Sequence, residues 1–252
     1  LAGTPDAGTE AFAYTHAARL LTAKYAPHYT DSTFSAAVTE RIPGTVYYIT
    51  LNHAPRRVLN GMDAVLSPRQ FNVLVEHLEI MDFSEEFFDL SPVPNALRRA
   101  ADETQFEDLD AEPGSYDSFE RLLNSIASEL ESVGDDAFVI VDSLTAFERG
   151  RHFGVDWGDV LGLLEGVRTA ASEWGGLVDV IYHARPDKVR SDETINTALD
   201  GALYFYTNDQ GTNAEKTMRV GDFNGALSRR RQVVYGTEVR DDGFRISSSR
   251  GV

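Results

Sequence analysis

The chain has 252 residues and a mass of 27.8 kDa, which is enough for one large or two small domains with a sizeable buried core. Apolar residues make up 42% of it, as in globular proteins, and the lack of cysteine excludes disulfides, thiolate nucleophiles and Cys-based zinc sites. A formal charge of -17 disfavours nucleic acid or an anionic membrane as the main partner, because binding either one relies on a positive surface.

The acidic composition also indicates where the protein works. Asp and Glu number 40 against 23 basic residues, and the only lysines are Lys24, Lys188 and Lys216. Carboxylates keep a surface hydrated in concentrated salt, which also screens their repulsion, so we predict a halophilic, archaeal source. No apolar run is long enough to span a bilayer and no basic segment leads into one, so we expect a cytoplasmic protein.

The first part of the chain is predicted to begin with a loop and a helix. Residues 3–8 are rich in turn formers, and residues 9–25 repeat apolar side chains at helical spacing. Since a strand normally launches such a helix in an α/β protein, we expect the first strand to precede Leu1. Residues 26–44 are turn-rich, which indicates an insertion, and residues 46–51 are predicted to form an apolar strand.

The middle of the chain alternates helices with an apolar strand. We predict helices over residues 68–78 and 115–133, because apolar side chains recur there every three or four positions. Residues 80–112 are acidic with little periodicity, and we treat them as a second insertion. Residues 137–141 are all apolar and are predicted to form a buried strand.

The last part of the chain changes character. We predict a helix over residues 157–174 and strands over residues 177–182 and 202–206. Short alternating runs then indicate antiparallel strands at residues 216–220, 232–239 and 244–247. The whole pattern predicts the α/β class, with a mostly parallel central sheet flanked by helices and C-terminal antiparallel strands. No composition shift marks a linker, so we predict a single domain over residues 1–252.

Gly3 and Gly8 have the separation of the two glycines in a phosphate-binding loop, and the second one leads directly into a helix. Such a loop surrounds phosphate oxygens with backbone N–H groups, while a Lys and a Ser or Thr complete the site. Thr9 and Glu10 stand at those two positions here. A glycine-rich turn that caps a helix has the same pattern, so both interpretations stay open.

Asp142 directly follows the predicted strand at residues 137–141, and Ser143 comes next. An acid at this place can orient magnesium and its water beside a phosphate loop, although an Asp that only caps the next turn gives the same pattern. Ser143 lacks the Gly-x-Ser-x-Gly surroundings of a hydrolase nucleophile, so we assign it no catalytic role.

The carboxyl ends of parallel strands share one crevice, where Glu10, His53, Asp142 and His183 are expected to converge. Two imidazoles and two carboxylates suit a divalent metal. Ordinary polar residues at strand ends explain the same positions without a metal, and we predict no metal site.

The other histidines and the one dense basic run suggest no chemistry. His16 is expected on the packing face of its helix, and His28, His77 and His152 have no ligand spacing. The three successive arginines at residues 229–231 are predicted to be a solvated turn between strands, with a partner or nucleic-acid contact as the alternative.

Seven ordered segments resemble the RecA-superfamily ATPases of the KaiC type. They are GTPDAGTEAF, VYYITLNHAP, AFVIVDSLTAF, LVDVIYHARP, ALDGALYFYT, RVGDFNGAL and VYGTEVRDDGFRI. They are similar in turn to the family's phosphate loop, second strand, acid-bearing strand, fourth strand, the strand that follows it and the terminal hairpins. The resemblance implies a RecA-like P-loop NTPase fold for nearly the whole chain, and it fades at residues 26–44 and 80–112.

The chain departs from this family at its charged positions. The family's two acids, which activate the attacking water, correspond to Asn52 and His53. Asn52 can neither take a proton from water nor add negative charge to polarise it. The two cations that reach a neighbouring subunit's phosphates in the family correspond to Asp222 and Asn224. The resemblance therefore implies the fold of an ATPase without its charged catalytic groups.

A free-energy count favours loss of ATP binding. A carboxylate at Glu10 set against polyphosphate costs about 1–4 kcal/mol, and the missing loop lysine removes a contact of roughly 1.5–3 kcal/mol. Together these weaken ATP binding by roughly two to five orders of magnitude. We therefore expect no cofactor and no ATPase activity.

These expectations favour a regulatory or signalling scaffold that acts through an unidentified protein partner, as a monomer or dimer because the subunit-bridging cations are absent. The main alternative is an ATP-binding switch or weak ATPase with magnesium, in which Asp142 and the loop backbone suffice. A DNA-recombination accessory protein is a second alternative, which the acidic composition opposes.

Overall fold

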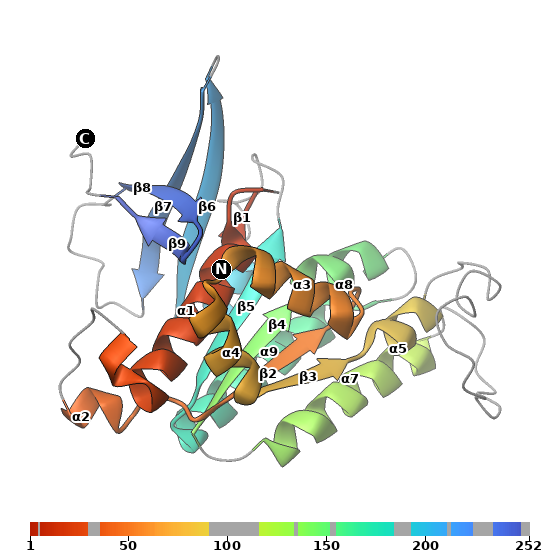
Figure 1. The fold of residues 1–252 in the computed structure, drawn as a ribbon. Helices are drawn as coiled ribbons and strands as arrows, with labels where there is room; N and C mark the ends of the chain where they lie inside the picture. The colour runs from red at the N-terminus through yellow and green to blue at the C-terminus, as the bar shows by residue number, and fades with distance from the viewer. Residues whose placement is uncertain are drawn as a thin grey trace.

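The computed structural model describes residues 1–4, 6–29, 36–90, 116–133, 136–151, 155–183, 193–210, 213–223 and 234–247. Within them, nine strands form one sheet in the order β3-β2-β4-β5-β1-β6-β7-β8-β9 (Figure 1). The strands from β3 to β6 run parallel, and β7, β8 and β9 are each antiparallel to the strand before them. This sheet confirms the predicted α/β class with antiparallel strands at its C-terminal edge.

The parallel strands alternate along the chain with helices. Their bounds are β1 Ala2–Gly3, β2 Thr45–Thr50, β3 Leu78–Asp82, β4 Ala137–Asp142, β5 Leu177–His183 and β6 Gly201–Gln210. The antiparallel strands are β7 Asn213–Phe223, β8 Val234–Arg240 and β9 Gly243–Ile246.

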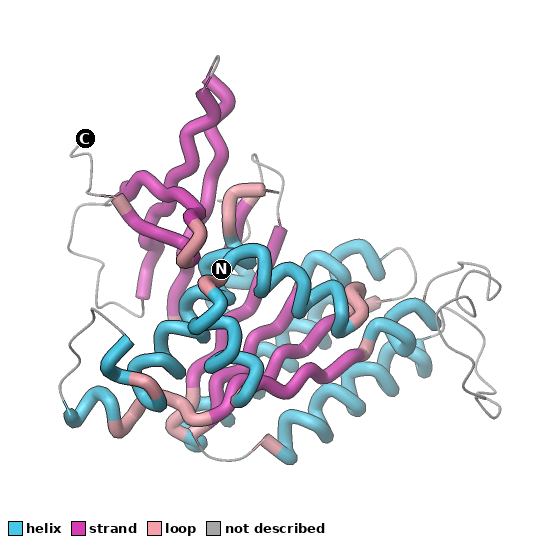
Figure 2. Tube along the Cα trace, in the orientation of Figure 1, coloured by secondary structure: helices cyan, strands magenta, loops and turns pink. Residues whose placement is uncertain are grey.

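Helices cover both faces of the parallel strands (Figure 2). One face carries α1 Thr9–Tyr25, α3 Pro55–Val65 and α4 Pro68–Glu76. The other face carries α7 Tyr116–Ser132, α8 Leu144–Gly150, α9 Trp157–Trp174 and α10 Glu193–Ala198. Shorter pieces are the 3-10 turn η1 Pro27–Tyr29 and the helices α2 Ala36–Thr39 and α5 Ser84–Asp89.

Strand β4 shows why the parallel strands are so apolar. All six of its residues are buried, and successive side chains point to opposite faces of the sheet. Phe138 and Ile140 pack into the core under α1, α3 and α4, whereas Val139 and Val141 pack into the core under α7, α8 and α9. Because β4 is covered on both faces, a polar side chain along it would be buried without water, and the first polar side chain is Asp142 at its end.

Strands β6 and β7 extend together beyond the other strands, and the β8–β9 hairpin returns to α1 (Figure 1). The backbone N–H of Phe244 in β9 donates a 2.8 Å hydrogen bond to Oγ1 of Thr15 in α1. The Phe244 ring packs against the rings of Phe12 and Phe205 at centroid distances of 5.4 and 5.8 Å. The hairpin therefore closes the sheet edge onto the first helix.

Several predicted bounds need correction. The strand that launches α1 includes Ala2–Gly3, later than the predicted position before Leu1, because two residues are too few to show an apolar pattern. Helix α4 ends at Glu76 and not at residue 78, since β3 begins at Leu78. Helices α3 and α8 and strand β3 have no counterpart in the sequence prediction.

Some predictions fall outside the described residues. They concern His152, Asn224, the arginines at 229–231, residues 30–35 of the first predicted insertion and residues 91–112 of the second. Helices α2 and α5 lie in the described parts of these two segments. Among the residues that the structure does describe, no helix is both long enough and apolar enough to cross a membrane.

Candidate functional site at the carboxyl edge of the sheet

The segment that follows β1 forms a tight loop before α1. The backbone N–H of Thr4 donates to the carbonyl of Phe205 at 3.2 Å, and that of Ala7 donates back to the carbonyl of Thr4 at 3.1 Å. Gly8 begins the helix with a φ of 97°, a left-handed conformation that favours glycine. The loop is therefore closed by its own hydrogen bonds, with the N-terminus of α1 at its end.

Thr9 points into the interior of the fold. Its side chain is fully buried, and a Cβ atom on Gly3 would overlap its Oγ1. Within the described part of the chain this oxygen has no hydrogen-bond partner. The hydroxyl thus lies against the backbone of β1.

Glu10, in the first turn of α1, pairs with His183 at the end of β5. Nε2 of His183 lies 3.2 Å from Oε1 of Glu10, and their side chains are 21% and 41% exposed. Burial raises the pKa of Glu10, but the hydrogen bond and charge of His183 and the backbone N–H of Glu10 itself outweigh it, so the pKa is lowered. Burial lowers the pKa of His183, but the bond and charge of Glu10 outweigh it, so that pKa is raised.

The backbone of His183 is held in place by α8. Its N–H donates to Oγ1 of Thr145 at 2.7 Å, and the same hydroxyl donates to the carbonyl of His183 at 3.3 Å. Gly3 and His183 are register partners in the neighbouring strands β1 and β5. The Glu10–His183 pair therefore joins the start of α1 to the end of the adjacent strand.

Asp142, at the end of β4, is bonded to a tyrosine of β2. The hydroxyl of Tyr48 donates to Oδ2 of Asp142 at 2.6 Å. The hydroxyl of Tyr14 lies 3.4 Å from that of Tyr48. Since Tyr48 donates its only proton to Asp142, its oxygen accepts the hydrogen bond from Tyr14. Burial raises the pKa of Asp142, and the bond from Tyr48 opposes this only in part. Burial also raises the pKa of Tyr14 to about 12, and that of Tyr48 well above its usual value.

Asn52 and His53 follow β2 in a turn. Oγ1 of Thr50 accepts the backbone N–H of His53 at 3.1 Å, and Nδ1 of His53 lies 2.6 Å from Oδ1 of Asn52. Burial lowers the pKa of His53, with Arg57 of α3 acting in the same direction and Asp142 against it. The imidazole of His53 is therefore already bonded to the neighbouring side chain.

The structure brings Glu10, His53, Asp142 and His183 into one neighbourhood, as predicted. They are close enough for the charge of each to shift the pKa of others. In the described residues, however, no three His, Asp or Glu side chains are arranged to hold a metal ion. The hypothetical metal site of these four side chains therefore has no geometric support.

The other predicted site residues that the structure describes lie before α8, in β7 and in α1. Ser143 is buried directly before α8, and the peptide bond from Asp142 to Ser143 is cis. Asp222 lies in β7 on the antiparallel side of the sheet, and Asn224 is outside the described residues. His16, predicted on a packing face, contacts the ring of Phe138 and bonds Asp179 at 2.9 Å.

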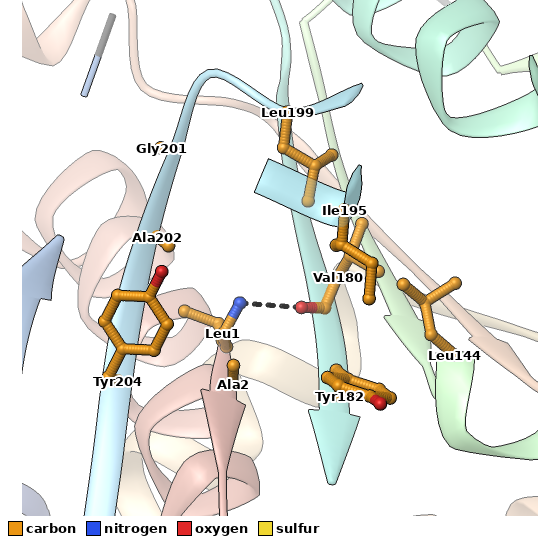
Figure 3. A pocket seen from close by; sticks show the side chains of 10 residues that line it. All are labelled: Leu1, Ala2, Leu144, Val180, Tyr182, Ile195, Leu199, Gly201, Ala202 and Tyr204. Atoms are coloured by element: carbon orange, nitrogen blue, oxygen red, sulfur yellow. Dashed lines mark hydrogen bonds between the residues drawn. The ribbon is translucent and has the colours of Figure 1, made fainter. Parts of the chain in front are cut away.

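A small cavity lies elsewhere, on the sheet face opposite α1 (Figure 3). The cavity measures about 20 Å³ and is lined mainly by apolar side chains. Beside it, the backbone nitrogen of Leu1 donates a 2.7 Å hydrogen bond to the carbonyl of Val180. Such a volume holds about one water molecule. This cavity is too small for a nucleotide, so the carboxyl edge remains the candidate site.

Comparison with known proteins bears on the fold. No protein-family model matches the chain, and no curated protein matches it significantly. A solved structure of a KaiC-like protein from the hyperthermophilic archaeon Pyrococcus horikoshii OT3 matches with a TM-score of 0.53 and 14% identity, covering 98% of this chain and 88% of that one. The fold is KaiC-like. The carboxyl edge of this KaiC-like fold carries the Glu10–His183 pair and the Tyr48–Asp142 bond.

Tyr14 and Tyr48 are site residues that sequence reasoning missed. Both lie inside predicted elements, where an aromatic side chain suggests only packing. The one available signal was chemical, since a buried tyrosine needs a partner for its hydroxyl. Tyr48 pairs with Ile140, so Asp142 is its diagonal neighbour on the same face of the sheet.

Proposed function

We propose that this protein is a RecA-like, KaiC-type chain that has lost ATPase chemistry and acts as a regulatory or signalling scaffold through contacts with another protein. The single observation that carries the proposal is the Glu10–His183 pair at the N-terminus of α1. A helix N-terminus attracts anions, and here the protein supplies its own carboxylate.

Mg-ATP does not fit the groups present. Glu10 would face the phosphates with a negative charge, and the hydroxyl of Thr9 is directed at Gly3 in the interior. One oxygen of Asp142 accepts the bond from Tyr48, and burial raises the pKa of this carboxyl, which disfavours the charge that magnesium needs. Asn52 and His53, bonded to each other, replace the acids that would activate water.

Isothermal titration with Mg-ATP in concentrated salt tests the proposal. We expect millimolar or weaker binding and no turnover in the wild-type protein. Glu10→Gln removes the repelling charge and should strengthen any residual binding by about tenfold or more. Micromolar binding with measurable turnover in the wild type would overturn the proposal.

An ATP-binding switch is the second candidate, and the position of Asp142 at the carboxyl end of β4 favours it. If Asp142 orients magnesium, Asp142→Asn should abolish nucleotide binding while the fold persists. The scaffold proposal expects the same titration curve for Asp142→Asn and the wild type. Light scattering tests the accompanying expectation of a monomer or dimer, and a hexamer would contradict it.

The source and location of the protein belong to the same proposal. The excess of acidic over basic residues supports a halophilic, archaeal protein, which we further propose to be cytoplasmic. If this is right, the free energy of unfolding should rise steeply with salt up to molar concentration, because counterions screen the net charge of -17. Stability that stays constant or falls with salt would contradict the halophilic origin.

A further inference from the structure

The Glu10–His183 pair joins the first turn of α1 to the end of β5. Glu10 belongs to α1, which follows the loop after β1, and His183 is the last residue of β5. Strand β1 pairs with β5 through Ala2 and Gly3, and His16, further along α1, contacts Asp179 of β5. The Glu10–His183 contact adds a side-chain constraint at the first turn of α1 itself.

Only one partner of this contact can change charge near neutral pH. The imidazole of His183 titrates in the physiological range, whereas Glu10 stays ionised. Losing the proton converts an ion pair into a weak contact between a carboxylate and a neutral ring. The contact is half-buried, so solvent screens it less than an exposed pair.

The surroundings make that proton important for the whole crevice. His183 faces Glu10 of α1, Asp142 of β4 and Arg149 of α8, and His53 of the turn after β2 also acts on it. Arg57 of α3 acts on His53 from the far side. When His183 is neutral, Glu10 loses the cation bonded to it and Asp142 loses a positive charge that acts on it.

We propose that the Glu10–His183 ion pair is a proton-dependent latch that ties the first turn of α1 to the end of β5. The latch is closed while His183 is protonated and is released as rising pH removes that proton. This inference rests on the proposed function, since it takes Glu10, and not a nucleotide phosphate, to be the anion at the N-terminus of α1. The raised pKa of His183 supports it, because pairing favours the protonated ring.

Amide hydrogen exchange of the full chain at pH 6 and pH 8 tests the latch. The reporters are the N–H of Phe12, bonded to the carbonyl of Gly8, and the N–H of His183, bonded to Thr145. After correction for intrinsic exchange, both protection factors should fall about two- to fivefold at pH 8. No fall in the wild type would overturn the proposal, whether or not any variant folds.

Two variants assign the effect to the pair. Glu10→Gln and His183→Gln should each remove the pH difference, and the double variant should add nothing further. NMR titration should also find a lower pKa for His183 in Glu10→Gln than in the wild type. A pH difference that survives in Glu10→Gln, or an unchanged His183 pKa, would refute the latch.

The chain offers a matched control in its other histidine–carboxylate contact on α1. Nδ1 of His16 lies 2.9 Å from Oδ2 of Asp179, away from the crevice. His16→Gln should keep the full pH difference at Phe12 and His183, and loss of it there would also count against the latch. The titration with Mg-ATP tests the proposed function and not the latch. Micromolar ATP binding would contradict the proposed function even if the pH difference in hydrogen exchange is observed.

Discussion

The hydroxyl of Tyr48 in β2 donates a 2.6 Å hydrogen bond to Oδ2 of Asp142 in the neighbouring parallel strand β4. Both side chains are buried, and their residues are diagonal neighbours on one face of the sheet. The bond gives the only acid at the end of β4 a fixed internal partner. A carboxylate satisfied in this way stabilises the fold and is less available to a metal ion.

Tyr48→Phe should therefore lower the free energy of unfolding by roughly 1.5–3 kcal/mol, because it leaves a buried carboxyl without its donor. The variant keeps the ring and its packing. Tyr14→Phe is the matched control, since it removes only the longer 3.4 Å contact to Tyr48 and should cost less than about 1 kcal/mol. Urea unfolding measures both, and equal losses would show that the Asp142 bond adds nothing.

The stability of the protein should depend on pH through Glu10 and His183. The pKa of His183 is raised from 6.5, so its stabilisation is complete below that pH and is lost as pH rises through the folded pKa. The pKa of Glu10 is lowered from 4.5, so its stabilisation is present above that pH and is lost as pH falls through its folded pKa. The pair therefore contributes most to the free energy of unfolding between pH 4.5 and pH 6.5.

This pH dependence can be measured as a difference in Tm between the wild type and a variant that lacks the ion pair. Glu10→Gln should lower Tm at pH 5.5 by up to about 4 °C relative to the wild type, and by less at pH 8. Scanning calorimetry at the two pH values provides the comparison. A Tm difference that is the same at both would mean that the charge of His183 plays no part.

Gly3→Ala should destabilise the protein by about 1–3 kcal/mol. The added methyl group would overlap Oγ1 of buried Thr9 and lie 3.0 Å from Cβ of buried Phe205. Gly162→Ala is the opposite case, because Gly162 is exposed in the interior of α9 with no atom near the new methyl group. It should stabilise by about 0.5–1 kcal/mol, and chemical unfolding that ranks the two variants the other way would contradict the tight approach of Thr9 to β1.

Phe244→Ala should cost about 3–5 kcal/mol, because a ring that is 3% exposed leaves a cavity between β9, α1 and β6. Ile246→Ala removes a side chain from the same strand that is 50% exposed and should change stability by no more than about 0.5 kcal/mol. Thermal unfolding of the two variants is the measurement. Similar losses would mean that the hairpin does not dock on α1 through Phe244.

Long elements with clear end signals are predictable from this sequence. The predicted helix over residues 157–174 has the bounds of α9, because Asp156 caps its start with a 2.6 Å bond to Gly158 and Gly175 ends it in a left-handed conformation. Strand β4 is similarly clear, since both of its faces are buried. In such elements the local preference and the packing agree.

Helix α3 and the tyrosine bonds show what sequence alone could not supply. Helix α3 is amphipathic but short, it buries only Val58 and Met62, and it contains Gly61, a poor helix former, so its residue preferences oppose the helix that its pattern supports. The Tyr48–Asp142 bond depends on the register between two strands that are far apart in the chain. That Glu10 and His183 lie in one crevice was predicted from the strand ends, but their direct contact depends on β1 lying beside β5, which no local pattern encodes.

Strand β1 has a consequence for how the protein is made. Gly3 pairs with His183 on one side and with Phe205 on the other, so β1 completes the sheet between two strands that come much later in the sequence. During translation β1 therefore has neither neighbour to pair with until β5 and β6 have left the ribosome. Since contacts between such distant segments form slowly, we expect the sheet to close at β1 late in folding.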